Sequence, residues 1–260
     1  MGPHDDRTYR TVIRIFRLVF RLLGLRLRVI GEHAVPSHGP AVLASNHLSY
    51  LDFAFVGLAG RRRRRLVRFM AKTAVFEHGV AGPLMRRMGH IPVDRASGAA
   101  AYRRAARELA AGELVGVFPE ATISRSFTLK SFKLGAATLA VREQVPLIPV
   151  VLWAPQRTFT VDKQYSLTRG KTVLIVVGEP IVPGRDADPA DVDAELRHRM
   201  DALLVEAWRA YPDQPRDDAD RWWVPAVAGG SAPTVEVAAD RERAAAERTA
   251  RRVAERRAHG

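Results

Sequence analysis

The stretch "PAVLASNHLSYLDFAFVGLAG" (residues 40–60) joins a short apolar segment to a second one that is compatible with a helix. Residues 41–46 are largely apolar, as expected of a strand covered on both faces. His47 follows this strand, and Asp52 stands five residues further on. The two are either a general base and its orienting carboxylate, or loop residues where Ser49 and Asp52 cap the next helix. Taken alone, the stretch favours the capping interpretation.

The same alternation continues along the chain. Further strand-like stretches are residues 66–71, 90–94, 114–119, 146–153 and 171–178. Helical stretches are residues 50–59, 79–88, 98–112, 132–144 and 191–211. Strands that alternate with helices predict a layered α/β domain.

The composition is strongly basic and lacks cysteine. The 260 residues are 47% hydrophobic and carry a formal net charge of +13, enough for one sizeable domain with a core. Such a charge suits an anionic partner, which could be nucleic acid, an anionic membrane surface or a phosphorylated ligand. Because there is no cysteine, disulfides, thiolate metal sites and cysteine nucleophiles are excluded.

The N-terminal stretch "TYRTVIRIFRLVFRLLGLRLRVIG" (residues 8–31) has arginines at helical spacing. One face of the predicted helix carries Arg10, Arg14, Arg17 and Arg21. Another carries Ile13, Phe16, Phe20 and Leu23. We therefore predict an amphipathic membrane-interface helix over residues 1–30, and the alternative is a helix packed on its own domain with its arginines in solvent. No uninterrupted apolar run is long enough to span a bilayer.

Two other segments set the predicted boundaries. The α/β domain is expected over residues 31–211, followed by an extended segment and a charged tail over residues 212–260, either helical or disordered. The run "RRRRR" (residues 61–65) is either a loop beside an anionic membrane or a solvated loop. It lacks interleaved aromatic residues and a zinc or RNA-binding signature, so no nucleic acid partner is expected.

Four blocks follow one another at predicted strand ends: "NHLSYLD" (residues 46–52), "GHIPVDR" (89–95), "FPEAT" (118–122) and "VPLIPV" (145–150). In this order they resemble the lysophospholipid acyltransferase family, whose best-known members are the 1-acylglycerol-3-phosphate acyltransferases. The resemblance implies a mixed sheet flanked by helices, with a basic apolar N-terminal element on the membrane. It also implies a peripheral or monotopic enzyme on the cytoplasmic face. That enzyme would use a lysophospholipid and an acyl-CoA or acyl carrier protein thioester, with no cofactor or metal.

The resemblance implies that His47 and Asp52 are catalytic. A lipid hydroxyl is a poor nucleophile at neutral pH, and a histidine can accept its proton and pass it to the leaving thiolate. A carboxylate on the other ring nitrogen would fix the tautomer, as in a Ser-His-Asp triad with the substrate hydroxyl in place of serine. No enzyme nucleophile is then required. The rival hypothesis, a non-catalytic basic module that binds membranes or nucleic acid, gives these two residues no reason to meet.

The resemblance also implies substrate-binding residues. Arg95 would hold the acceptor phosphate, because guanidinium suits phosphate oxygens, unless it is a surface arginine paired with Asp94. Lys72 matches a lysine position that faces the phosphate in relatives. Glu120 either shapes the acceptor site, as in the family, or caps a helix at a strand end.

The third block departs from the family pattern Phe-Pro-Glu-Gly-Thr-Arg-Ser. Ala121 replaces the glycine, and Ile123 replaces an arginine that would contact phosphate. We expect Arg125, Lys130 or Lys133 to compensate. If none does, the acceptor is a lipid other than lysophosphatidate.

Overall fold

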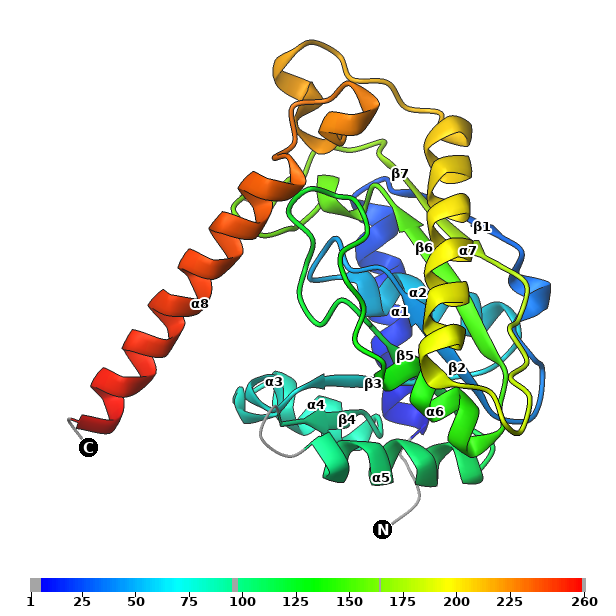
Figure 1. Cartoon of the computed structure of the whole chain (residues 1–260). Coiled ribbons are helices and arrows are strands. Elements are labelled where there is room, and N and C mark those ends of the chain that lie inside the picture. The colour runs from blue at the N-terminus through cyan, green and yellow to red at the C-terminus, as the bar shows by residue number, and fades with distance from the viewer. Residues whose placement is uncertain (1–5, 95–97, 164, 259–260) are drawn as a thin grey trace. The chain divides into compact units, whose positions relative to one another are not determined.

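The computed structural model describes residues 6–94, 98–163 and 165–258 (Figure 1). The chain divides into two compact units. The first unit comprises Met1–Ile123 and Ser131–Asp213, and the second comprises Ser124–Lys130 and Gln214–Gly260. All the strands belong to the first unit.

The first unit is built on a mixed sheet. Its strands are β1 (Arg26–Ile30), β2 (Ala41–Ser45), β3 (Val67–Lys72), β4 (Ile91–Val93), β5 (Leu114–Val117), β6 (Leu147–Trp153) and β7 (Thr172–Val177). Their order is β1-β7-β6-β2-β5-β3-β4, and within it β6 and β7 pair antiparallel whereas the other neighbours pair parallel. The predicted α/β fold with a mixed sheet is therefore confirmed. The parallel strand β2 lies in the middle and delivers His47 at its carboxyl end.

Helices cover both faces of the sheet. They are α1 (Asp6–Leu22), α2 (Asp52–Arg62), α3 (Thr73–Glu77), α4 (Ala81–Arg87), α5 (Gly98–Ala110), α6 (Gly135–Glu143) and α7 (Pro189–Ala210), with short 3-10 helices at Glu32–Ala34 and Pro155–Arg157. In Figure 1, α7 lies in front of the sheet, and α1 and α2 lie behind it. None of the described helices is both long and apolar enough to cross a membrane.

The central strands can consist of largely apolar residues because both of their faces are covered. Every residue of β2, β6 and β7 is buried, which matches their continuous apolar sequences. Packing is close enough in β5 to require a glycine: a Cβ at Gly116 would lie 2.5 Å from the ring of Phe69. This packing density makes the sheet a rigid support for the loops at its ends.

The predicted N-terminal helix is shorter than the sequence suggested. It ends at Leu22, where Gly24 adopts a left-handed φ of 62°. Residues 26–30 form β1 instead, an edge strand in parallel register with β7 (Arg26 opposite Thr172). Its side chains alternate between exposed and half-buried, which is the pattern of an edge strand rather than of a helix.

Helix α1 packs on its own unit with the aromatic residues that the sequence had assigned to the bilayer. Phe20 is only 2% exposed and stacks on Phe55 at 4.8 Å between ring centroids. Phe16 contacts Phe53 edge-on at 5.5 Å. The prediction that Phe16 and Phe20 enter the membrane is wrong, because these rings fill the space between α1 and the core.

The start of α1 is held by polar contacts. Arg68 of β3 is 1% exposed, and its guanidinium bonds the carboxylates of Asp6 (2.9 Å) and Glu113 (3.2 Å). The hydroxyl of Tyr9 donates to the backbone carbonyl of Val67 at 2.7 Å. Removal of α1 would take Asp6 away from the buried guanidinium of Arg68 and leave that charge less well compensated. We therefore regard α1 as an integral part of the unit.

A second apolar stripe of α1 remains exposed. It consists of Ile15, Leu18, Val19 and Leu22. These positions are three, four and seven residues apart, which puts them on one face of the helix. The five arginines of α1 are also exposed. The helix therefore has one face in the core and another of aliphatic side chains beside arginines.

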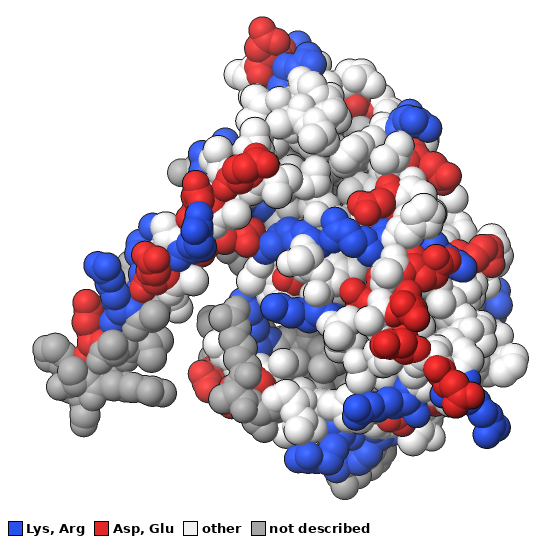
Figure 2. Space-filling model, in the orientation of Figure 1, with Lys and Arg blue, Asp and Glu red and all other residues white. Residues whose placement is uncertain are grey.

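The second unit contains two 3-10 helices, Ala219–Trp223 and Ala226–Ala228, and helix α8 (Val235–Ala258). The charged tail was expected to be either helical or disordered, and the structure shows a helix over Val235–Ala258. Figure 2 shows that α8 carries both signs of charge along its surface. Within this unit the ammonium of Lys130 pairs with Glu242 at 2.5 Å.

Candidate active site

Asn46 anchors the turn that follows β2. Its side chain is fully buried and exchanges two hydrogen bonds with the backbone of Leu152: the amide nitrogen donates to the carbonyl (3.0 Å), and the amide oxygen accepts from the N–H (2.7 Å). The side chain thus replaces one rung of the β2–β6 ladder. As a result, the chain can turn away after Ser45 and leave His47 at the edge of the sheet.

Asp52 gathers the turn around one carboxylate oxygen. Its Oδ2 accepts from His47 Nδ1 (2.8 Å) and from the backbone N–H groups of Leu48 (2.6 Å) and Ser49 (2.8 Å). The predicted contact between His47 and Asp52 is therefore present. Asp52 is the first residue of α2, so the carboxylate reaches back across the turn.

The contact determines what the imidazole can do. A carboxylate can only accept, so Nδ1 of His47 carries the proton and Nε2 is the basic nitrogen. Burial raises the pKa of Asp52, while the hydrogen bond from His47 and the two backbone donors lower it. The side chain of His47 is 21% exposed whereas that of Asp52 is fully buried, which leaves the imidazole as the member of the pair that a substrate can reach.

The capping interpretation is not borne out for α2, because Leu51, the residue that caps this helix, makes no side-chain cap bond. Ser49 Oγ accepts from the N–H of Leu51 at 3.1 Å, and Asp52 accepts from the N–H of Ser49. These bonds satisfy backbone donors of the turn that precedes the helix. The same carboxylate therefore organises this turn and orients His47.

Glu120 supports His47 from the neighbouring strand. Glu120 is 4% exposed and its Oε1 accepts from the backbone N–H of His47 at 3.0 Å. No helix follows Glu120 directly, since the next one is α6, so the helix-cap alternative is wrong. Phe118, from the same segment, stacks on the His47 ring with centroids 4.4 Å apart. The third block thus fixes both the backbone and the ring of the histidine.

Lys72 is exposed at the carboxyl end of β3 and pairs in register with Val93 of β4. Two strand spacings separate β3 from β2, which is about 10 Å, so Lys72 lies on the same edge of the sheet as His47. Arg95, two residues after Val93, lies outside the described residues. Its convergence with Lys72 remains a prediction, and the register places Val93, the last residue of β4, beside Lys72.

The residues proposed to replace the missing arginine lie in different places. Lys133 is exposed, and its N–H donates to the carbonyl of Pro119 at 2.9 Å, directly beside Glu120. Arg125 and Lys130 belong to the second unit, where Arg125 is half-buried. Ile123 is 7% exposed and serves as a core residue. Of the three candidates, Lys133 is the one whose backbone forms a hydrogen bond next to Glu120.

The run of five arginines is not a free loop. Arg61 and Arg62 form the last turn of α2, and Arg65 donates to the carbonyls of Gly39 (2.9 Å) and Gly112 (2.5 Å). Partial burial and the nearby charges of Arg17 and Arg62 lower the pKa of Arg61. Arg61 thus lies close to the arginine stripe of α1, whereas Arg65 holds two loops together.

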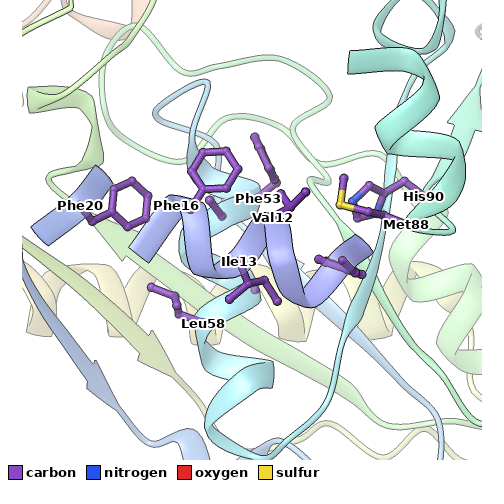
Figure 3. A pocket seen from close by; sticks show the side chains of 11 residues that line it. Val12, Ile13, Phe16, Phe20, Phe53, Leu58, Met88 and His90 are labelled. Atoms are coloured by element: carbon purple, nitrogen blue, oxygen red, sulfur yellow. The ribbon is translucent and has the colours of Figure 1, made fainter. Parts of the chain in front are cut away.

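An apolar pocket opens between α1 and α2. Figure 3 shows Val12, Ile13 and Phe16 of α1 and Phe53 and Leu58 of α2 among the side chains that line it.

A series of aromatic contacts connects His47 with this pocket. Phe118, which stacks on His47, lies 6.0 Å from Phe69, and Phe69 lies 6.4 Å from Phe53 and 5.7 Å from His90, both of which line the pocket. Distances are between ring centroids. A series of packed rings, with Phe69 buried among them, therefore connects the imidazole with the pocket.

The fold is a mixed α/β sheet that presents a histidine bonded to a buried carboxylate at a strand end, an arrangement in which the imidazole can act as a general base. The family model described as Acyltransferase matches residues 26–153. The human 1-acyl-sn-glycerol-3-phosphate acyltransferase alpha is 33% identical over 203 residues, which cover 75% of this chain and 70% of the human protein. The chain belongs to the acyltransferase family.

Bacterial proteins are also similar. The 1-acyl-sn-glycerol-3-phosphate acyltransferase of Bacillus subtilis is 25% identical over 209 residues, covering 75% of this chain and all of that protein. The crystal structure of the 1-acyl-sn-glycerophosphate acyltransferase PlsC from Thermotoga maritima superimposes with a TM-score of 0.66 at 20% identity, over 79% of this chain and 81% of the other. The similarity to the Thermotoga maritima structure supports the fold.

Proposed function

We propose that the protein transfers an acyl group from an acyl thioester to the free hydroxyl of 1-acylglycerol-3-phosphate and thereby forms phosphatidate. The observation that carries this proposal is the 2.8 Å contact between His47 Nδ1 and Asp52 at the carboxyl end of β2, in a chain of the acyltransferase family. The relatives named above act on this acceptor.

His47 can manage both proton transfers of the reaction. Nε2 takes the proton of the acceptor hydroxyl as its oxygen attacks the thioester carbonyl carbon, and Asp52 stabilises the imidazolium. When the tetrahedral intermediate collapses, the carbon–sulfur bond breaks and the imidazolium protonates the leaving thiolate. The ester bond replaces the thioester bond, and the enzyme returns to its starting state without a covalent intermediate.

The acceptor is tested with a panel of lysolipids. Purified protein is supplied with one acyl-CoA and, separately, with lysophosphatidate, lysophosphatidylglycerol, lysophosphatidylcholine or monoacylglycerol. We expect the highest kcat/KM for lysophosphatidate. A higher value for a lysolipid without a phosphomonoester would refute this choice of acceptor.

One observation favours a second candidate acceptor. Ile123 occupies the position of a phosphate-binding arginine in the family and is buried, so this position offers no cation. If Lys133 does not replace that charge, the same chemistry would serve a lysolipid with a different headgroup. The panel distinguishes the two candidates directly.

Lys72→Ala should raise the KM for lysophosphatidate by about tenfold, because a charge-assisted bond to phosphate is lost. The KM for acyl-CoA should stay within about twofold. Arg199→Ala, which removes a partly exposed arginine that pairs with Glu195 on α7, is the control. An equal rise of both KM values in the Lys72 variant would contradict a role in holding the acceptor phosphate.

We also propose that the pocket between α1 and α2 holds an acyl chain. Gly57 lines it, and a Cβ at this position would meet nothing within 4 Å. Gly57→Phe should therefore fill the pocket and shift kcat/KM toward substrates with shorter chains. Chain-length series of both donor and acceptor measure this shift, with Val205→Phe on α7 as the control. Unchanged preference in both series would show that no acyl chain enters the pocket.

The exposed face of α1 is proposed to rest on an anionic membrane. Because Phe20 and Tyr9 are part of the core, deleting α1 would damage the fold, and the test uses exposed positions instead. Leu18→Ser combined with Leu22→Ser should weaken binding to anionic vesicles by at least about tenfold. Each surface arginine adds about 1 kcal/mol, so the binding should also fall as salt rises. Co-sedimentation with vesicles measures both effects, and binding at wild-type strength by the double variant would exclude this face.

We place the enzyme on the cytoplasmic face as a peripheral protein, because acyl-CoA and acyl carrier protein thioesters are made in that compartment. Cell fractionation followed by protease protection of membrane vesicles tests this location. Protection of the protein inside right-side-out vesicles, with digestion in inverted ones, is expected.

A further inference from the structure

We propose that the loop between β6 and β7 is a second membrane-contact element, which seats the mouth of the active site on the bilayer. The described residues of this loop, 154–163 and 165–171, are called the rim loop. The inference rests on the proposed function, since only a lipid acceptor requires the site to face a bilayer. It concerns a different part of the molecule from α1.

The rim loop lies at the end of the sheet where His47 lies. β2 and β6 are parallel, so Trp153, the last residue of β6, is at the same edge as the end of β2. β7 is antiparallel to β6, so its first residue, Thr172, is at that edge too. Both ends of the rim loop therefore start from the edge that carries the histidine.

Hydrogen bonds fasten the rim loop to the turn that holds His47. The carbonyl of Phe159 accepts from Ser49 Oγ (2.6 Å) and from the N–H of Tyr50 (3.2 Å). The hydroxyl of Thr160 donates to the carbonyl of Leu48 at 2.6 Å, and Thr160 is 2% exposed. A surface that binds the rim loop would therefore also fix the position of the turn that holds His47.

Large apolar side chains project from this assembly into solvent. Tyr50 is 48% exposed and Phe159 38%, with their ring centroids 4.7 Å apart, while Tyr165 is 69% and Leu167 64% exposed. Tyrosine is suited to the boundary between headgroups and acyl chains, because its ring is apolar and its hydroxyl can stay in water. Aromatic residues beside an exposed leucine form a patch with the chemistry of that boundary.

The patch continues onto α1. The N–H of Gly170 donates to the carbonyl of Gly24 at 3.2 Å, and the guanidinium of Arg169 donates to the carbonyl of Leu22. Leu22 is 62% exposed and belongs to the apolar stripe of α1. The rim loop therefore lies next to the face already proposed to meet the membrane, and Arg169 adds a positive charge that suits anionic headgroups.

The distribution of exposed apolar side chains in the first unit favours a bilayer as the occupant. Apart from α1, the described ones that follow the strand ends beside His47 are Tyr50, Val75, Phe159, Tyr165 and Leu167, while Val80 and Leu134 directly precede α4 and α6. Ile30 and Val182 lie at the other end and Val205 on α7. An apolar rim around a site for a lipid, flanked by arginines, fits a lipid surface better than scattered single residues would.

Single cysteines test the contact, because the chain has none of its own. Leu167→Cys and Tyr165→Cys are labelled in the full chain with an environment-sensitive fluorophore such as NBD. The control is Val182→Cys: Val182 is 75% exposed, and its neighbour Ile181 pairs with Leu147, the first residue of β6, at the opposite end of the sheet. Each labelled protein is mixed with vesicles of phosphatidylglycerol and phosphatidylcholine.

We expect the emission of the labels at positions 165 and 167 to shift to shorter wavelength on vesicles and to be quenched by lipids with brominated chains. The label at position 182 should show neither change. In addition, Leu167→Ser should weaken vesicle binding by about tenfold, and Val182→Ser should not. Labels at 165 and 167 that stay in water while the protein co-sediments with vesicles would overturn the proposal, as would a shift that depends on protein concentration without vesicles, which would indicate contact between copies.

Acyl transfer is assayed on the wild-type protein in parallel. Vesicle contact at positions 165 and 167 without acyl transfer from any thioester would refute the proposed function and leave the surface intact. Acyl transfer with water-exposed labels would refute the surface alone.

Discussion

His47→Ala lowers the rate of acyl transfer by at least ~10²-fold, because the acceptor hydroxyl then loses the base that removes its proton. The imidazole makes its hydrogen bond to Asp52 and stacks on Phe118, and it is partly exposed, so its removal should leave the fold intact. Initial rates of phosphatidate formation measure the effect, and circular dichroism checks the fold.

His33→Ala is the matched control for this variant. His33 is exposed, follows β1 in the chain and lies 3.6 Å from Glu179. Its replacement removes an imidazole from the other end of the sheet and should leave the rate within about twofold. A folded His47→Ala protein with near-normal rate would refute general-base catalysis by this residue.

Asp52→Asn lowers the rate by up to about 10⁴-fold, through the orientation and tautomer of His47. An amide at this position can donate to Nδ1, which would place the imidazole proton on Nε2 and remove the base. All three bonds reach the same atom, Oδ2, so an amide nitrogen there can no longer accept from the N–H groups of Leu48 and Ser49. An amide oxygen there keeps these bonds but carries no negative charge to stabilise the imidazolium.

Stability should fall by less than activity in this variant. Burial raises the pKa of Asp52, so replacement of the carboxylate by a neutral amide removes a desolvation cost that partly offsets weakened backbone hydrogen bonds. The unfolding midpoint in urea should therefore fall modestly while the rate falls strongly. Wild-type activity in Asp52→Asn would show that the carboxylate only organises the turn before α2.

The fold could be predicted where strands are continuous apolar runs. β2, β6 and β7 are buried on both faces, and this pattern is visible in sequence. β1 was missed because its arginines and aliphatic residues continue the composition of α1, and its strand identity depends on pairing with β7, whose residues stand 146 positions further along the chain. α3 is only five residues long, too short for a helical period to be recognised.

The site could be predicted only as far as its motifs reach. The spacing of His47 and Asp52 and the family blocks pointed to a contact between these two residues, and this contact is present. The bonds from Asn46 to Leu152 and from Thr160 to Leu48 join residues more than 100 positions apart, so no local pattern signals them. An asparagine directly after an all-apolar strand was the one available hint for Asn46.

The two faces of α1 show a related limit. Apolar residues surround most of this helix, and sequence alone does not say which of them the core covers. Packing against Phe53 and Phe55 selects Phe16 and Phe20, which leaves Ile15 and its neighbours outside.

The central claim is direct acyl transfer from a thioester to lysophosphatidate, and the most direct measurement is the stoichiometry of that reaction with purified protein. Released CoA thiol and phosphatidate are measured together, with and without lysophosphatidate, and intact protein mass is recorded at the same time. We predict one phosphatidate per thiol, thiol release that requires the acceptor, and an unmodified protein mass. Failure to form phosphatidate from acyl-CoA or acyl carrier protein thioesters, or an acyl group left on the protein, would contradict it.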